Sequence, residues 1–132
     1  APSSRYEKFS NQGEYKKYLL GKFPEEKKGI EEYFAALKEA SIAYSRSYVF
    51  KCIPLPLAQL LVWTGLNKII DGGYSKWSSI TLQQALQKMT KNKELQAVLS
   101  SNYVLEGCDP SRSPFVLHAA IAGAFRHGAF FP

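Results

Sequence analysis

The chain has 132 residues, of which 45% are hydrophobic, 14% aromatic and 21% charged. This length and apolar content predict one folded domain with its own core, and the aromatic content excludes a disordered chain. The net charge of +6 is spread evenly: residues 1–51 hold ten basic and seven acidic residues, and residues 52–132 hold seven and four. Because nucleic-acid binders concentrate their basic residues in a stripe or block, we expect no nucleic acid as a partner.

The two ends of the sequence differ in composition from ordinary protein termini. Residues 1–4, Ala-Pro-Ser-Ser, show neither the charged nor the apolar region of a signal peptide. Residues 128–132, Gly-Ala-Phe-Phe-Pro, are hydrophobic, whereas C-termini are more often polar and frayed. We therefore expect the chain to be a piece of a longer protein.

The first half of the sequence predicts two helices. Residues 14–22 form a short basic helix candidate. Pro24 suits the first turn of the next helix, because its missing N–H has no partner there, and the apolar spacing extends this helix to about Tyr48. The apolar stripe of this helix consists of Ile30, Tyr33, Phe34, Leu37 and Tyr44.

A Pro-Leu-Pro segment follows. Pro54 and Pro56 require an extended entry, and Pro56 can then start a helix that stops at Gly65. This helix is apolar nearly all round, so it is either buried or partly embedded in a membrane interface, and we favour burial. No apolar run reaches the roughly 20 residues that cross a bilayer.

The second half of the sequence contains several predicted helix caps and a turn. Residues 66–77 are ambiguous, with a turn at the Asp-Gly-Gly of residues 71–73. Thr81 and Gln84 fit the capping box of one helix, and Asn92 can cap the next.

A last helix begins at Ser113-Pro114 and stops at Gly128, after which residues 128–132 are extended. The sequence therefore predicts a mainly α fold of five or six helices that ends in a short extended segment.

Motifs for cofactor, metal or nucleophilic chemistry are missing from the sequence. Gly72-Gly73 is too weak to cradle a phosphate, and no G-x-G-x-x-G follows a strand. His118 and His127 are nine residues apart, about half a turn out of phase on one helix, so they cannot converge on an ion. The two cysteines match no signature and are expected to be part-buried free thiols. We expect no catalytic, cofactor-binding or metal-binding residue in this chain.

Aromatic residues near the C-terminus are the remaining candidates for a binding site. Phe115 and Phe125 share a helical face with His118, and Phe130 and Phe131 follow Gly128. Such residues are more often core than pocket, yet they can line a channel for a long apolar ligand. For His118 a core role is slightly favoured, and both interpretations stay open.

Four short blocks of sequence resemble a known family. The blocks are residues 22–27 with 30–33, residues 55–57 with 59–61, residues 94–100, and the set Gly107, Ser113, Phe115, His118, Ala119, Gly128, Phe130 and Pro132. Their order and spacing are similar to those of the phytoene-desaturase-like flavoproteins, a family that includes retinol saturases and carotenoid isomerases. The resemblance covers residues 22–132, and residues 1–21 match less well.

This resemblance implies a function for a larger parent protein. Residues 22–132 would be the helical cap or substrate-side domain of a flavoprotein that holds FAD elsewhere, in a Rossmann-type domain, and residues 1–21 an N-terminal extension with a short helix. The parent would be an FAD-dependent oxidoreductase acting on a polyene such as retinol or a carotenoid, and the chain alone would not be catalytic. The implied substrate-binding residues are Phe115, His118, Phe125, Phe130 and Phe131.

The resemblance also implies a membrane surface as a partner, at the endoplasmic reticulum, or in a plastid for the carotenoid relatives. An alternative stays open: a non-catalytic helical accessory subunit, derived from such an enzyme, within a larger assembly that contains membrane or pigment. Both interpretations predict the missing flavin motifs, and the composition of the chain ends favours the first.

Overall fold

The computed structural model describes residues 11–101 and 107–124, and within these ranges it is built from eight α-helices and one 3-10 helix, with no strand. The mainly α expectation is confirmed. The expected extended segment, residues 128–132, lies outside the described residues. In chain order the elements are α1 (Gln12–Lys22), η1 (Pro24–Glu26), α2 (Lys27–Lys51), α3 (Leu55–Trp63), α4 (Asn67–Asp71), α5 (Tyr74–Ser78), α6 (Leu82–Met89), α7 (Lys93–Leu99) and α9 (Phe115–Ala124).

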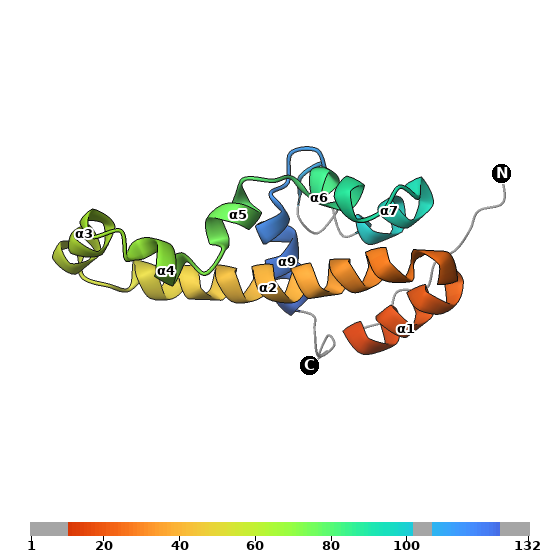
Figure 1. Ribbon diagram of the computed structural model, residues 1–132, viewed down its shortest axis with the longest axis horizontal. Helices are drawn as coiled ribbons and strands as arrows, with labels where there is room; N and C mark the ends of the chain where they lie inside the picture. Colours follow the sequence, from red (N-terminus) through yellow and green to blue (C-terminus); the bar gives the residue numbers. More distant parts are fainter. Residues whose placement is uncertain (1–10, 102–106, 125–132) are drawn as a thin grey trace.

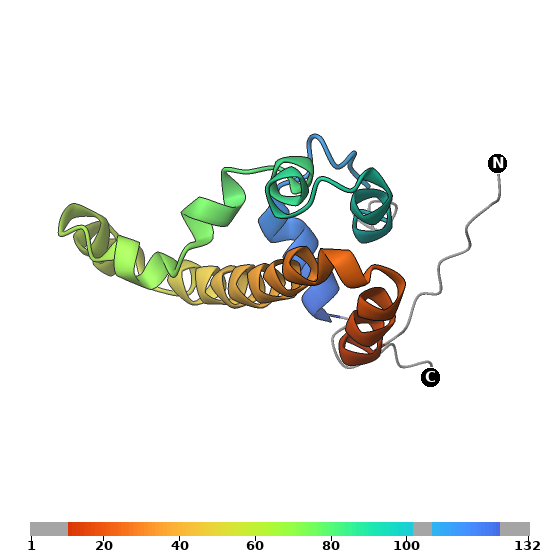
Figure 2. The same ribbon diagram turned by 45° about the vertical axis from the view of Figure 1, so that its right-hand side comes forward.

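The 25-residue helix α2 is the axis of the molecule. Figure 1 shows α9 crossing the middle of α2, with α1 beside its first half and α3 and α4 at its far end. At 1.5 Å per residue α2 is roughly 37 Å long, which lets one helix contact both ends of the fold. The turned view of Figure 2 confirms that α6 and α7 lie at the opposite end from α3.

The core lies where α2 meets α6 and α9, with α7 packed against α6. The expected stripe of α2 is confirmed: Ile30, Tyr33 and Leu37 are buried, and Phe34 and Tyr44 are partly buried against the same cluster. The other helices complete the cluster with Leu82, Ala85 and Leu86 from α6, Leu95, Val98 and Leu99 from α7, and Phe115, Val116 and Ala119 from α9.

The helix caps lie where the sequence places them. The Thr81 hydroxyl accepts a hydrogen bond from the Gln84 backbone N–H at 3.3 Å, and the Gln84 side chain accepts one from the Thr81 N–H at 3.1 Å. Asn92 accepts bonds from the backbone N–H groups of Glu94 and Leu95. Each cap satisfies N–H groups that have no partner within the helix, so both starts are defined locally.

The ambiguous segment, residues 66–77, folds into the two five-residue helices α4 and α5. Gly72 and Gly73 separate them with positive φ angles of 56° and 91°, in the region that glycine adopts without strain. These two short helices bring the described number above the expected five or six.

Candidate functional site

Two of the sequence-predicted site residues, Phe115 and His118, lie together on α9 and face the core. Both side chains are buried, with ring centroids 6.1 Å apart. His118 Nε2 is hydrogen-bonded to the Tyr33 hydroxyl on α2 at 2.8 Å. This bond and the surrounding apolar contacts hold α9 on α2.

The other three predicted site residues, Phe125, Phe130 and Phe131, lie outside the described residues. Their role as substrate contacts stays a prediction.

Trp77 is a core residue that the sequence did not single out. The ring centroids of Trp77 and Phe115 are 5.0 Å apart, and the Lys76 ammonium lies 4.3 Å from the Trp77 ring centroid. The buried indole N–H of Trp77 has no hydrogen-bond partner among the described residues. A buried N–H is normally paired, so this indole N–H marks Trp77 as unusual. No pattern in the sequence indicates it.

The helix α3 carries a large exposed apolar surface. No residue of α3 is buried, and five of its large apolar side chains are exposed. We favoured burial from the sequence, and the described part of the chain does not provide it, because α3 lies beyond the end of α2 and away from α6, α7 and α9 (Figures 1 and 2). The exposed side chains are Leu55, Leu57, Leu60, Val62 and Trp63, and Leu66 and Ile69 continue them toward α4.

An apolar hollow of about 440 Å³ lies on this surface. Its wall combines Phe50 at the end of α2 with α3 side chains, and only Gln59 is polar. Such a lining suits an apolar ligand or an acyl chain. The lining residues are Phe50, Leu55, Ala58, Gln59, Val62 and Trp63.

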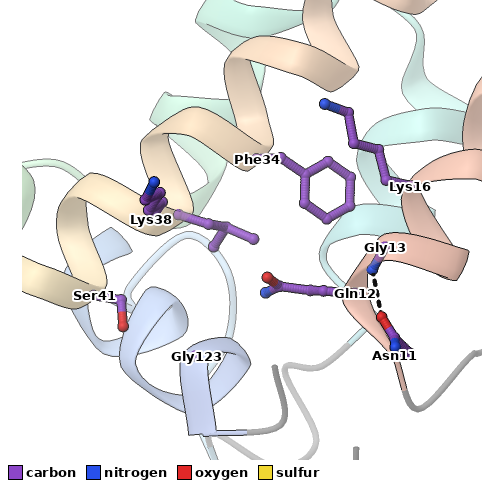
Figure 3. A pocket seen from close by; sticks show the side chains of 9 residues that line it. Asn11, Gln12, Gly13, Lys16, Phe34, Lys38, Ser41 and Gly123 are labelled. Carbon is purple, nitrogen blue, oxygen red and sulfur yellow. Dashed lines mark hydrogen bonds between the residues drawn. The ribbon is translucent and has the colours of Figure 1, made fainter. Parts of the chain in front are cut away.

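A second hollow, of about 370 Å³, lies at the junction of α1, α2 and α9. Figure 3 shows Lys16 and Lys38 at its rim on either side of Phe34, with Ser41 close to Gly123. The Lys16 ammonium lies 6.0 Å from the centroid of the Phe34 ring. Two cationic groups beside an aromatic wall favour anionic groups over cations. The sequence did not predict this hollow, since its walls come from segments more than 80 residues apart.

The described residues do not fit FAD in the dinucleotide-binding mode. Gly72 and Gly73 lie between two five-residue helices, whereas pyrophosphate binding needs a glycine turn between a strand and a helix N-terminus. We therefore assign no described residue to a flavin.

Three further features of the described residues concern metal ions, thiols and membranes. Within them no group of three or more His, Cys, Asp or Glu side chains is placed to hold a metal ion. Cys52 and Cys108 are free and exposed, where the sequence led us to expect part-buried thiols. Over the same residues, none of the helices combines the length and the apolar content needed to pass through a bilayer.

Comparison with known proteins finds similarity to one group of proteins over 96% of the chain. No family model and no solved structure matches it. All-trans-retinol 13,14-reductase of Danio rerio is 32% identical over 127 residues, which are 96% of this chain, and the Rattus norvegicus protein of the same name is 34% identical over 124 residues, 94% of this chain. The chain is retinol saturase-like. The Homo sapiens protein of that name is 32% identical over 127 residues.

The retinol saturase-like chain spans about a fifth of the length of these curated relatives, 21% of the Danio rerio protein and 20% of the Rattus norvegicus protein. The resemblance read from four blocks is thereby confirmed. A second Danio rerio protein, named inactive all-trans-retinol 13,14-reductase, is 24% identical over 127 residues. Similarity in this segment is thus shared by a relative that is named inactive.

Proposed function

We propose that this chain is the helical, substrate-side segment of an FAD-dependent oxidoreductase that acts on a polyene such as retinol. The observation that carries the proposal is the similarity of 96% of the chain to one segment, 21% of the length, of a protein named for the reduction of all-trans-retinol. Residues 22–132 form the substrate-side domain, and residues 1–21 form an extension. FAD is held by parts of the parent outside this chain.

The chemistry of the described surface supports this proposal. Retinol is a long apolar molecule with one polar end, and such ligands are held by apolar walls with few polar groups. The hollow between Phe50 and α3 has that lining. The hydrogen bond between Tyr33 and His118 holds α9 on the long helix, so the segment that follows Ala124 starts from a packed element.

The predicted site residues take two roles in this proposal. Phe125, Phe130 and Phe131 contact the polyene. Phe115 and His118 lie earlier in the chain, on α9, and are fully buried, so they support these contacts from the core side. The contribution of this chain is to bind and orient an apolar chain and to exclude water from it.

We further propose that the parent works at a membrane, at the endoplasmic reticulum for a retinol substrate or in a plastid for a carotenoid. The support is the resemblance to the family together with the exposed apolar side chains of α3.

Turnover by the full-length protein tests the proposal. Loaded with FAD and supplied with detergent-dispersed all-trans-retinol and a reductant, it should form a product two hydrogen atoms heavier, measured by liquid chromatography and mass spectrometry. Phe130→Ala should lower kcat/KM by roughly tenfold or more at unchanged flavin absorbance, while Phe130→Leu should retain most of it, since the apolar volume is largely kept. If the flavin-loaded protein turns over neither retinol nor a carotenoid, the proposed function is wrong.

The second candidate is a non-catalytic helical subunit derived from such an enzyme. The same segment occurs in a relative named inactive, so the segment does not by itself imply catalysis. Intact mass spectrometry of the natural protein separates the two. A mass several times the 14.8 kDa of this chain supports the enzyme segment, and a mass near that value supports the subunit.

A further inference from the structure

We infer that α3 and the turn into α4 form an interfacial anchor that enters the headgroup region of an anionic phospholipid bilayer. The inference rests on the proposed function only in taking a membrane as the source of the apolar substrate. It assigns the surface, the depth and the lipid chemistry, and its experiment is read without turnover.

The exposed apolar area at this end of the molecule is unusual for a water-facing surface. Trp63 is 85% exposed, Leu55 is 70% exposed and Ile69 is 75% exposed. Contiguous patches of this kind mark sites that bind another apolar surface. Tryptophan is enriched where a membrane meets water, because its ring is apolar and its N–H can remain hydrated.

The distribution of these side chains around α3 favours a bilayer over a protein groove. Leu57, Val62 and Trp63 are roughly a third of a turn apart around the helix axis, and all three are exposed. A helix bound in a protein groove buries one face and leaves the opposite face polar. An all-round apolar helix would leave apolar area in water when one face is covered by a groove, and sinking into lipid removes more of that area from water.

The length of α3 excludes a spanning helix. Nine residues span roughly 14 Å, far short of the roughly 30 Å of hydrocarbon that a spanning helix crosses. A helix too short to span lies in the interface, where the apolar faces of such helices are about 5–10 Å deep.

Charge identifies the lipid. Between Glu39 and Asp71 the sequence holds no acidic residue, and its three charged residues there are Arg46, Lys51 and Lys68. All three are exposed, and Lys51 and Lys68 flank α3 on either side along the chain. Basic residues beside an inserted apolar segment bind anionic headgroups, so phosphatidylserine or phosphatidylinositol lipids fit better than neutral ones.

The position of α3 in the fold permits insertion without disturbing the core. Figure 1 and Figure 2 both show α3 at one extreme of the molecule, at the end of α2 farthest from α1, α6 and α7. No buried core residue belongs to α3. The anchor can therefore enter lipid while the packed helices stay in water.

Flotation of the full-length protein with vesicles tests the apolar part of the anchor. The vesicles contain phosphatidylcholine with 30 mol% phosphatidylserine, a composition chosen as a probe. We expect Trp63→Gln and Leu57→Gln each to weaken binding several-fold, because each removes apolar area that lipid would cover. Ile42→Gln is the matched control, an exposed apolar side chain on α2 away from the anchor, and should bind as the wild type does.

The charge part is tested with a matched pair of double variants. Lys51→Glu with Lys68→Glu should lower binding to the anionic vesicles by on the order of tenfold or more. Lys17→Glu with Lys91→Glu makes the same change in net charge at exposed positions at the other end of the molecule and should have a clearly smaller effect. Wild-type binding should fall when pure phosphatidylcholine replaces the mixture or when salt is raised.

Each of the following outcomes would overturn the inference. In the first, the α3 variants bind vesicles as the wild type does. In the second, they change only the melting temperature, which means that another part of the protein covers α3. In the third, the wild type does not bind vesicles and the variants abolish its dimer, which means that a second copy covers α3. Turnover of detergent-dispersed retinol is measured separately on the wild type, so the proposed function and the anchor can fail independently.

Discussion

The hydroxyl of Tyr33 and Nε2 of His118 are 2.8 Å apart inside the core, and they join α2 to α9 across 85 positions of sequence. Phe115 flanks the imidazole at 6.1 Å, and the Tyr33 ring flanks it at the same distance. The geometry thus supports the core role for His118, the slightly favoured of the two roles that the sequence left open.

Replacing His118 tests that role. His118→Ala should lower the free energy of unfolding by about 3 kcal/mol, because it leaves a cavity and deprives the buried Tyr33 hydroxyl of a partner. Tyr33→Phe keeps the ring and should cost about 1 to 2 kcal/mol. Thermal and urea unfolding of the full-length protein measure both. A variant that loses turnover at an unchanged melting temperature would instead place His118 in the substrate site.

The packing of α2 against the end of α6 gives a second prediction. A Cβ added at Gly29 would lie 2.7 Å from the backbone oxygen of Met89, which cannot rotate away. Gly29→Ala should therefore destabilise the fold by about 1 to 3 kcal/mol. Gly21→Ala is the matched control: it lies within α1 with open space around it and should stabilise by about 0.5 to 1 kcal/mol. Equal urea midpoints for the two variants would contradict the close approach of α2 and α6.

The alkaline stability of the protein should depend on Tyr15. Burial, and secondarily the neighbouring Tyr18, raise the pKa of Tyr15 to about 12. In the unfolded chain the pKa of this phenol is near its ordinary value of 10.0, so ionisation favours the unfolded state only above about that pH. The contribution of Tyr15 is complete below pH 10 and should decline by about 2 kcal/mol as the pH approaches 12, allowing for partial exposure.

Denaturant unfolding at a series of pH values between about 9 and 12 measures this decline in the free energy of unfolding, and phenolate absorbance follows the ionisation. Tyr15→Phe should flatten the dependence. A variant with the same slope as the wild type would show that Tyr15 is not responsible.

Flavin binding by the chain alone is the last prediction. The 132-residue chain, expressed in a flavin-replete host, should emerge colourless from gel filtration, because its described residues offer no strand, glycine turn and helix N-terminus for the pyrophosphate. The full-length protein treated in parallel is the control and should retain a flavin absorption band. A yellow 132-residue chain would show that the flavin site extends into this segment.

Local signals in the sequence predicted most of the helices well. The apolar stripe placed α2, although Pro24 opens the 3-10 turn η1 and α2 itself begins at Lys27. Thr81 with Gln84, and Asn92 with its following N–H groups, placed the starts of α6 and α7. Caps and prolines act on backbone groups within a few residues, so they can be read without knowing the fold. Residues 66–77 could not be assigned because five-residue helices are unstable alone and depend on packing against α2 and α9.

The candidate sites depend far more on tertiary structure. The sequence alone determined that this is a mainly helical chain of retinol saturase-like pattern, with an apolar helix after Pro54 and aromatic residues near its end. Only the tertiary structure decided that His118 is paired with Tyr33, that Lys16 and Lys38 border one hollow, and that α3 is exposed. The physical reason is that burial and pairing are properties of segments brought together from distant parts of the chain. The spacing of apolar residues within one helix does not show which element packs against that helix.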